Sequence, residues 1–499
     1  MRLLLVLLLA AWLAAAAGAQ GRPTVVVGSK AFPESWILGD ALVQLARQGG
    51  ASATHRKSLG ATEIVYKALL QGSIDVYPEY TGTVAEVLVK EPGGRPSMAR
   101  MLEVLADQGI GMSYPLGFND GYGLAVRRST ATREGLQKIS DLAAHPRLKF
   151  GLTPEFMGRQ DGWPGLSAAY GLGAFQPLSM QHELAYAAVA SGQVQVVDIY
   201  TTDPQIQKLD LVVLQDDKAF FPRYDAVLLY RADLPRRAPG AWASMLRLVG
   251  RLTEEEMIRA NAMVALDQKD SEQAAAALLA QALGGASAPP PPPPAPSVAR
   301  SILANTATHI KLVAISLAAA VVVGIPLGIL ATRSRALASL TLAGAGLLQT
   351  VPSLALLAFL IPFLGVGFKP ALVALFLYSL LPIVNNTYTG LTSIPQSLSE
   401  AAQALGLSPA AQLLQVRLPM ASPAILAGIK TSAVINVGTA TLAALIGAGG
   451  LGQPILQGIT LVDRGLIFQG AVPAALLALL VQGLFDLAER VLVPRGLRL

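Results

Sequence analysis

The pattern of apolar and polar positions divides this chain of 499 residues into two unlike halves. Up to about residue 284, short apolar runs alternate with stretches whose apolar residues recur at helical spacing. We predict a helix at 34–48 and buried strands at VVVG (25–28), KFGLT (149–153), VQVVDIY (194–200) and LVVLQD (211–216). Such alternation is typical of an α/β architecture with a mostly parallel sheet. Ligands of these sheets bind on the loops beyond the carboxyl ends of the strands.

The second half consists of long apolar stretches with few charges. Each stretch is close to the ~20 residues that a helix needs to cross a bilayer core. We predict five membrane spans, at about 309–331, 339–364, 370–391, 423–447 and 467–493. Pro352 lies inside the second stretch, which is therefore either one helix or a broken one. The chain is thus predicted to be a multi-pass protein of the inner (plasma) membrane.

The N-terminus indicates export. Arg2 precedes the apolar run LLLVLLLAAWLAAAA, which leads into Ala17-Gly18-Ala19. This order is typical of a secretory signal peptide, which we predict at residues 1–19 with cleavage after Ala19; an uncleaved anchor is the alternative. Either one places the first half on the periplasmic or extracellular side. Five spans then place Arg333, Arg335 and Arg417 on the cytoplasmic side, as the positive-inside rule requires.

A proline-rich segment separates the two halves. GGASAPPPPPPAPS (284–297) contains six consecutive prolines and is typical of a semi-rigid polyproline II spacer of about 3 Å per residue. We therefore predict a solute-binding domain at 22–284, a linker at 285–298 and a transmembrane domain at 300–499.

Composition and charge exclude several classes of function. The net charge is +6, and no dense basic block with interleaved aromatic residues occurs, so we expect no nucleic-acid partner. The absence of cysteine excludes disulfides, thiolate metal sites and a cysteine nucleophile. The four histidines are scattered without the spacing of metal ligands, and no nucleophile–base pair is visible. We therefore expect no metal, no cofactor and no enzymatic activity in this chain.

The segment between the third and fourth predicted spans carries a recognisable motif. It reads Glu400-Ala401-Ala402, then Gly406 after three intervening residues, then Leu418-Pro419. This resembles the EAA loop of ABC-importer permeases, in which a short Ala-rich helix ended by a glycine docks on an ATPase. The resemblance implies a cytoplasmic ATP-binding subunit at the 400–419 loop; an ordinary surface helix is the alternative. Because no GxxxxGK[ST] occurs in the sequence, the partner has to supply ATP hydrolysis.

Further stretches resemble one family of these importers, the glycine betaine/choline/carnitine (osmoprotectant uptake) systems. In the membrane half they are LLQTVPSLALLAFLIPFLGVG (347–367), LPIVNNTYTGL (381–391) and GTATLAALIGAGGLGQPI (438–455). In the first half they are VGSKAFPESWILG (27–39), DVYPEYTGT (75–83), GFNDGYGLAV (117–126), DIYTTDPQI (198–206) and LQDDKAFFPRYDAVLLY (214–230). The resemblance implies a two-lobed periplasmic-binding-protein fold, type II-like, followed by an all-α permease domain. With five spans per chain, a pathway implies a homodimer.

The resemblance also implies a ligand site. Binding proteins of this family surround a quaternary ammonium group with tyrosines, because aromatic faces attract a cation that cannot donate a proton. Four tyrosines match the family's motifs: Tyr80, Tyr122, Tyr200 and Tyr224. For the polar end of the ligand the candidates are Thr83, Ser29 and Lys30, and Lys30 suits a carboxylate.

Several alternatives stay open at this point. Any one of the tyrosines, taken alone, is as well explained by packing. The same architecture suits another bulky zwitterion such as ergothioneine. A membrane-anchored ligand sensor is an alternative of a different class, although no signalling domain follows the predicted spans. The leading expectation is an ABC-importer subunit that binds and translocates glycine betaine, carnitine or choline.

Overall fold

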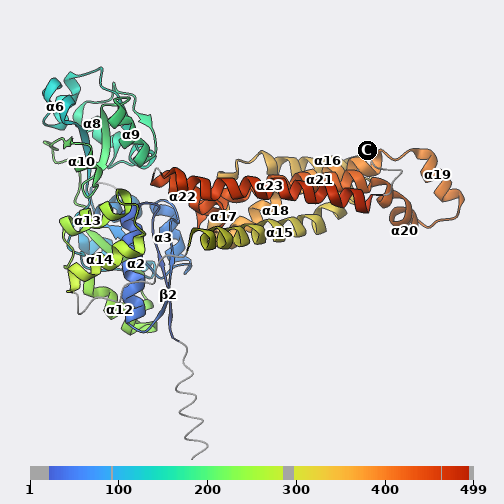
Figure 1. The fold of residues 1–499 in the computed structure, drawn as a ribbon, viewed down its shortest axis with the longest axis horizontal. Helices are drawn as coiled ribbons and strands as arrows, with labels where there is room; N and C mark the ends of the chain where they lie inside the picture. The colour runs from blue at the N-terminus through green and yellow to red at the C-terminus, as the bar shows by residue number, and fades with distance from the viewer. Residues whose placement is uncertain (1–21, 92–93, 285–296, 462, 494–499) are drawn as a thin grey trace, which may run out of the picture. The chain divides into compact units, whose positions relative to one another are not determined.

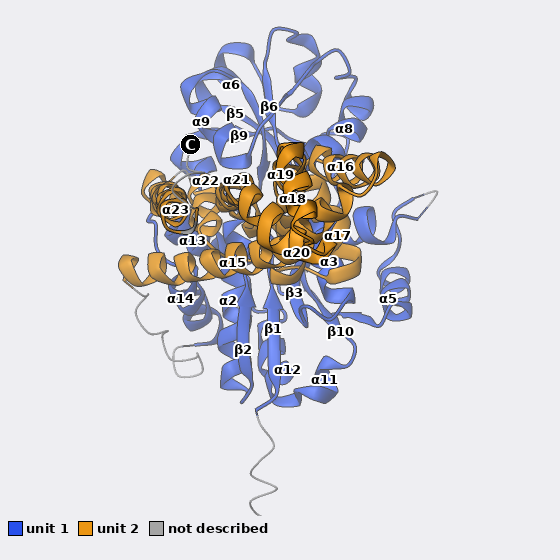
Figure 2. Cartoon of the chain, turned by 90° about the vertical axis from the view of Figure 1, so that its right-hand side faces the viewer, with its two compact units in different colours: residues 1–294 blue, residues 295–499 orange. Residues whose placement is uncertain are grey.

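The computed structural model describes residues 22–91, 94–284, 297–461 and 463–493. The chain divides into two compact units, residues 1–294 and 295–499 (Figure 2). The predicted signal peptide at 1–19 lies outside the described residues, as does the predicted linker at 285–298 except for its last two positions. The domain boundaries therefore stay predictions.

The first unit contains two lobes, each built around a five-stranded sheet (Figure 1). The sheet of the first lobe has the order β2 (Ser52–Arg56), β1 (Thr24–Gly28), β3 (Val76–Tyr80), β10 (Ala226–Arg231), β4 (Ile110–Met112). The sheet of the second lobe has the order β7 (Leu178–Ser179), β6 (Phe150–Leu152), β8 (Val196–Tyr200), β5 (Tyr122–Arg127), β9 (Leu211–Val213). All four strands predicted from the sequence are present, and Val25 and Val27 of β1 are fully buried, as a core strand requires.

Each sheet is mostly parallel in strand direction, as predicted, but one strand in each runs the opposite way, so both sheets are mixed. In the first sheet β1 pairs in parallel with β2 and β3, whereas β10 is antiparallel to β3 and β4. In the second sheet β5 is likewise antiparallel to β8 and β9. The reversed strands, β5 and β10, are those that receive the chain after it crosses between the lobes. They begin at the cleft, where β1, β3, β6 and β8 end.

Two crossing segments form the hinge between the lobes. Residues 113–121 lead from β4 into β5, and residues 214–225 lead from β9 into β10. The segments run antiparallel and are bridged at Asn119 and Asp225. The Asp120 backbone N–H donates to the Tyr224 carbonyl oxygen at 3.0 Å on the same ladder. A paired hinge of this kind holds the two sheet edges opposite each other.

Helices cover the faces of both sheets. In the first lobe they are α2 (Pro33–Gln48), α3 (Thr62–Leu70), α4 (Thr81–Thr83), the π-helix η1 (Val84–Val89), α5 (Met98–Asp107), α11 (Leu234–Arg237), α12 (Pro239–Met245), α13 (Glu254–Ala265) and α14 (Ser271–Leu283). In the second lobe they are α6 (Arg128–Glu134), α7 (Pro154–Gly158), α8 (Trp163–Tyr170), α9 (His182–Ser191) and α10 (Gln205–Lys208). The long helix predicted at 34–48 is α2, which begins with a proline at its first position and is buried along most of its length.

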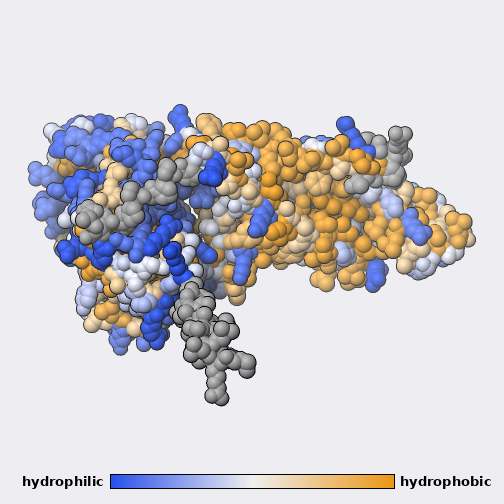
Figure 3. Space-filling view, turned by 60° about the horizontal axis from the view of Figure 1, so that its bottom comes forward, coloured by the Kyte–Doolittle hydropathy of each residue, from blue (hydrophilic) through white to orange (hydrophobic). Residues whose placement is uncertain are grey.

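The second unit is entirely helical in the described residues. Its helices are α15 (Val298–Ala331), α16 (Arg335–Thr350), α17 (Ser353–Leu364), α18 (Phe368–Thr392), α19 (Gln396–Ala404), α20 (Pro409–Ala411), α21 (Leu418–Thr439), α22 (Gly452–Thr460) and α23 (Arg464–Leu492). Four helical stretches are long and apolar enough to cross a membrane, namely Val298–Ala331, Phe368–Thr392, Pro409–Ile446 and Arg464–Val491. The face of this unit that is seen in Figure 3 is mostly hydrophobic, as membrane-spanning helices require.

The second predicted span is broken. Helices α16 and α17 meet at an angle of 97° beside Pro352, and together they count as a fifth candidate span or as a re-entrant pair. Elsewhere small residues bring the helices close together. A Cβ placed on Gly428 of α21 would lie 2.7 Å from the Pro382 carbonyl oxygen of α18. Only glycine allows this approach, which is a common device of membrane-helix packing.

Candidate ligand-binding site

The sheet topology brings the four tyrosines to one place. Tyr80 is the last residue of β3 and Tyr200 is the last residue of β8. Tyr122 is the first residue of β5, whose register places it directly opposite Tyr200. In the other sheet Tyr80 is paired with Ala226 of β10, and Tyr224 precedes Ala226 by two positions. The two reversed strands thus bring Tyr122 and Tyr224 to the cleft, beside the strand ends that carry Tyr200 and Tyr80.

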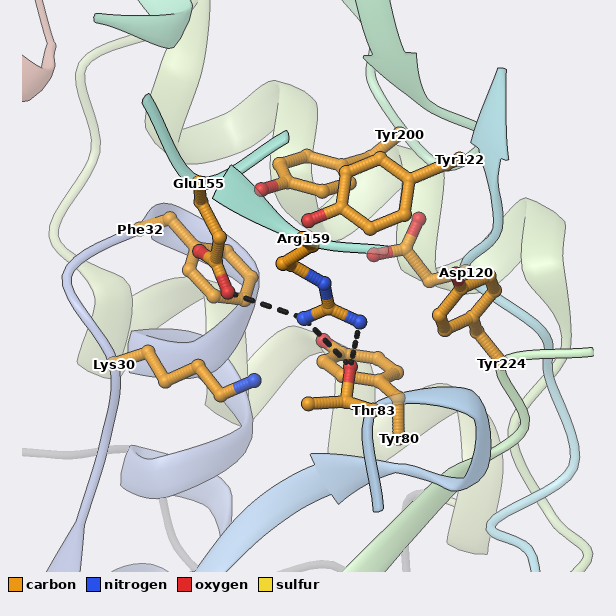
Figure 4. A pocket seen from close by; sticks show the side chains of 10 residues that line it. All are labelled: Lys30, Phe32, Tyr80, Thr83, Asp120, Tyr122, Glu155, Arg159, Tyr200 and Tyr224. Carbon is orange, nitrogen blue, oxygen red and sulfur yellow. Dashed lines mark hydrogen bonds and ion pairs between the residues drawn. The ribbon is translucent and has the colours of Figure 1, made fainter. Parts of the chain in front are cut away.

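A pocket lies where these residues meet, and both lobes contribute to its wall (Figure 4). It encloses about 300 Å³ of space between atoms, part of which is open to solvent. The residues that line it are Lys30, Phe32, Tyr80, Thr83, Asp120, Tyr122, Glu155, Arg159, Tyr200 and Tyr224. Six of the seven residues predicted to bind the ligand are in this set.

The aromatic rings contact one another around Tyr122. Its ring centroid lies 5.2 Å from that of Tyr200 and 5.5 Å from that of Tyr224, the latter edge-on. Phe32 stacks on Tyr200 at 5.8 Å from the opposite lobe. Rings packed at these distances present their faces and edges in fixed directions. Burial raises the pKa of Tyr122 and of Tyr80 well above the usual value, so both phenols stay neutral.

The Arg159 side chain extends into the middle of this pocket (Figure 4). Its guanidinium carbon lies 5.5 Å from the centroid of the Tyr122 ring, within cation–π range. Both terminal nitrogens donate to Thr83 Oγ1 at 3.3 Å, and one also donates to Glu155 at 3.2 Å. The guanidinium further pairs with Asp161, which accepts from Nε at 2.8 Å. A cation of the protein therefore lies against the aromatic wall.

A second cation approaches from the first lobe. Lys30 follows β1, and its Nζ lies 5.3 Å from the centroid of the Tyr80 ring. The same nitrogen is ion-paired with Glu79 Oε1 at 2.5 Å, and both side chains are buried. Lys30 and Arg159 thus supply positive charge on two sides of one small pocket, while their carboxylate partners keep that charge neutralised.

Ser29 does not line the pocket. Its hydroxyl lies 2.8 Å from His55 Nε2, and His55 Nδ1 lies 2.7 Å from Asp40 Oδ1. All three side chains are buried, and burial lowers the pKa of His55. Although this order resembles a catalytic triad, Ser29 is fully buried and does not line the tyrosine pocket. The Ser29 side chain thus anchors the β1 end that carries Lys30.

Neighbouring groups fix the tyrosine rings. The Tyr80 hydroxyl donates to Glu34 Oε1 at 2.6 Å, and the Tyr224 hydroxyl donates to Asp161 Oδ2 at 2.7 Å. A Cβ on Gly82 would lie 2.5 Å from the Tyr224 ring, so the Thr-Gly-Thr turn after β3 needs glycine here. The rings are therefore held in place before any ligand arrives.

Sequence reasoning missed several pocket residues: Phe32, Asp120, Glu155 and Arg159. Phe32 and Asp120 lie within stretches already singled out by the family resemblance, and their proximity to the tyrosines could have indicated them. Glu155 lies on α7 and Arg159 directly follows it, in a segment without any matching motif. No group of three or more His, Cys, Asp or Glu in the described part of the chain could hold a metal ion.

The EAA-like segment of the second unit forms an exposed helix with a defined end. Helix α19 stops at Ala404, and Gly406 has a φ of +73°. The Leu407 N–H donates to the Ala402 carbonyl oxygen and the Gly406 N–H to that of Gln403, the pattern of a Schellman motif. In this turn Ala402 is buried, whereas Glu400, Ala401 and Gly406 are exposed.

Comparisons with known proteins cover both units. Residues 23–281, just over half of the chain, match the family described as substrate binding domain of ABC-type glycine betaine transport system. Residues 324–497 match the binding-protein-dependent transport system inner membrane component. The choline transport system permease protein of Bacillus subtilis (strain 168) is 45% identical over 197 residues, which are 40% of this chain and 91% of that protein.

Two further relatives extend the comparison to the first unit. The ergothioneine transport permease/ergothioneine binding protein of Helicobacter pylori (strain G27) is 31% identical over 277 residues, 55% of this chain and 50% of that protein. A crystal structure of a glycine betaine/carnitine/choline ABC transporter is 29% identical, with a TM-score of 0.43, and covers 50% of this chain and 96% of that one. The chain thus belongs to the family of substrate-binding domains of ABC-type glycine betaine transport systems, fused in one polypeptide to an inner-membrane permease component that works with a separate ATPase.

Proposed function

We propose that this chain captures a small trimethylammonium compound in the cleft of its first unit and passes it through its own membrane unit. Glycine betaine and carnitine are the preferred solutes, and choline is the third. The observation that carries this proposal is the position of Arg159, whose delocalised cation lies against Tyr122 inside a ring of aromatic side chains. An aromatic wall that already holds one delocalised cation suits another.

The cationic side chains account for the other end of the ligand. A trimethylammonium group that takes the aromatic position displaces the guanidinium of Arg159. The displaced guanidinium and Lys30 then have a carboxylate within reach, and an arginine–carboxylate pair forms two charge-assisted hydrogen bonds. Glycine betaine and carnitine supply such a carboxylate, whereas choline has only a hydroxyl. We therefore infer a preference for the zwitterions, with Thr83 as a further polar contact.

Ergothioneine is a second candidate, favoured by the similarity to the Helicobacter pylori protein, in which permease and ergothioneine-binding functions share one chain. This zwitterion carries the same trimethylammonium and carboxylate groups on a larger body. The pocket, which encloses about 300 Å³ of space between atoms, has to widen further for it. A ligand panel that contains both sizes separates the two candidates.

The arrangement in the membrane completes the proposal. The binding unit faces the periplasm or the exterior, where export by the N-terminal segment delivers it, and α19 faces the cytoplasm, where the ATP-binding subunit docks through the exposed Glu400 side chain. Two copies of the chain form one pathway, because four or five spans are few for a permease. Tethering raises the effective concentration of the binding unit at its permease to the order of mM.

Transport in a reconstituted system tests the proposal. The full chain, reconstituted into proteoliposomes with its ATP-binding subunit, is given radiolabelled glycine betaine, carnitine, choline or ergothioneine, with glycine as the unmethylated control. We expect ATP-dependent uptake of at least one trimethylammonium zwitterion and none of glycine. Uptake of glycine at the same rate, or no uptake of any panel member by a complex that hydrolyses ATP, would contradict the proposal.

A further inference from the structure

Behind the tyrosines, a buried hydrogen-bonded cluster joins the two lobes. The Thr202 hydroxyl oxygen lies 2.6 Å from Glu34 Oε2 and 2.8 Å from Asp120 Oδ1. Glu34 belongs to α2 of the first lobe, Thr202 follows β8 of the second lobe, and Asp120 lies on a crossing segment. Each of the three residues is at most 5% exposed. Because its members come from different lobes, this cluster exists only while the lobes are in contact.

The hydrogen bonds of the cluster require that one of its carboxyl groups is protonated. The hydroxyl of Thr202 has one proton and can donate to only one carboxylate oxygen. Two carboxylate oxygens nevertheless lie within 2.8 Å of the Thr202 hydroxyl oxygen. If both Glu34 and Asp120 were ionised, one of these contacts would place two acceptors against each other in a buried site, without a proton between them. One carboxyl group therefore carries a proton and donates it to Thr202.

The surroundings identify Asp120 as the protonated group. Burial raises the pKa of Glu34, but Glu34 accepts from the Tyr80 hydroxyl at 2.6 Å and from Asn261 Nδ2 at 2.9 Å, and both donors favour its ionised form. Among the described residues, the Asp120 carboxyl group has only one hydrogen bond other than that with the Thr202 hydroxyl, a long one accepted from the Thr202 backbone N–H at 3.3 Å. Burial raises the pKa of Asp120 well above the usual value, and the negative charge of Glu34 raises it further.

The other charged groups near the cluster are already paired. Asp203, next to Thr202, lies 2.8 Å from His182 Nε2 and also raises the pKa of Asp120. On the first lobe, Lys30 is paired with Glu79. The Tyr80 phenol stays neutral because burial raises its pKa. Within the described residues, neither carboxyl group of the cluster has a lysine, arginine or histidine as an ion-pair partner.

We propose that Glu34, Thr202 and Asp120 form a proton-holding latch, which couples contact between the two lobes to the uptake of one proton at Asp120. The coupling to ligand capture rests on the proposed function, because capture accompanies closure of the lobes. When the lobes separate, both carboxyl groups return to water and to ordinary pKa values of about 4. At any pH between this ordinary pKa and the raised pKa of Asp120, closure of the lobes therefore takes up a proton from solvent.

The sign of the effect follows from linkage. A form that binds an extra proton is favoured as pH falls, so the ligand binds more tightly at lower pH within this window. For one full proton the Kd rises about tenfold per pH unit, and it becomes independent of pH outside the window. The hydroxyl of Tyr80, which donates to Glu34, connects the latch directly to the wall of the pocket.

Calorimetry on the full chain in lipid nanodiscs measures the coupling. Glycine betaine is titrated at several pH values, each in two buffers of different ionisation enthalpy, so that the number of protons taken up can be calculated. We expect about one proton per ligand in the window. Asp120→Asn supplies an amide N–H in place of the acid proton, and we expect this variant to lose the uptake and the pH dependence. Asp225→Asn, on the other crossing segment, is the control, and we expect it to keep both the proton uptake and the pH dependence.

Infrared difference spectroscopy tests the latch without relying on ligand binding. The spectrum of wild type minus Asp120→Asn at neutral pH, recorded with and without glycine betaine, is expected to contain the carbonyl band of a protonated carboxylic acid. Absence of that band in both conditions overturns the latch, whatever the calorimetry gives. A band without any binding of the panel ligands supports the latch and counts against the proposed function. Binding without proton uptake overturns the coupling.

Discussion

The guanidinium carbon of Arg159 lies 5.5 Å from the centroid of the Tyr122 ring, inside the pocket that both lobes line. The same guanidinium is held by Thr83, Glu155 and Asp161. The aromatic wall is thus already in contact with a cation before a ligand arrives. In the proposed binding mode, a zwitterionic quaternary ammonium ligand competes with this side chain for the ring and offers it a carboxylate in return.

Replacing Arg159 separates these two effects. Arg159→Met keeps an unbranched, largely apolar side chain of shorter reach and removes its charge. We expect the Kd for glycine betaine to rise about tenfold or more, the usual effect of losing a hydrogen-bonded charge partner. The Kd for choline, which has no carboxylate, changes by less than about threefold or falls. Calorimetry with both ligands checks this, and an equal loss for the two would refute the carboxylate role of Arg159.

Replacing Glu400 tests whether α19 docks on the ATP-binding subunit. Glu400→Lys reverses the charge of an exposed side chain on α19, and we expect it to abolish ATP-dependent uptake in proteoliposomes. Ligand affinity, measured on the same preparation, stays at the wild-type value because the residue belongs to the other unit. Glu255→Lys, an equally exposed charge reversal on α13, serves as the control and keeps uptake. Unimpaired uptake in Glu400→Lys would show that α19 is not part of the surface on which the ATP-binding subunit docks.

His182 gives the binding unit a pH-dependent stability. Burial alone would lower the pKa of His182, but the charge of Asp203 at 2.8 Å outweighs it and raises the pKa to about 9. Because this value exceeds the unfolded one of about 6.5, the stabilisation is complete below pH 6.5 and is lost as pH rises through 9. We expect the thermal unfolding midpoint of wild type to exceed that of His182→Gln below pH 6.5. A difference between the two unfolding midpoints that does not shrink toward pH 9 would contradict the ion pair.

Most of the fold could be predicted from the sequence because its signals are local. The four strand predictions rested on short β-branched runs such as Val25 to Val27, and the structure confirmed them. The family resemblance and the two-lobed fold class were also confirmed. The direction of β5 and β10 could not be predicted, because it depends on where the chain crosses between lobes. The break at Pro352 was visible, but its 97° bend depends on the packing of α16 and α17.

The site could be predicted only where a motif marked it. Tyr122 and Tyr200 stood in motifs of the family, and strand register then placed them opposite each other. Arg159 could not be found, since its segment has no motif and its side chain reaches the pocket from another part of the chain. Ser29 has the expected position in sequence, but its side chain bonds to His55, a partner that only the pairing of β1 with β2 brings close.

The most direct test of the tyrosine pocket compares three variants of the full chain in one calorimetric titration with glycine betaine. Tyr200→Ala removes an aromatic ring from the pocket, Tyr200→Phe keeps the ring, and Tyr114→Ala removes a ring that is 82% exposed. If aromatic faces bind the trimethylammonium group, Tyr200→Ala raises the Kd by about tenfold or more, while the other two stay within about threefold of wild type. Wild-type affinity in Tyr200→Ala would contradict the account.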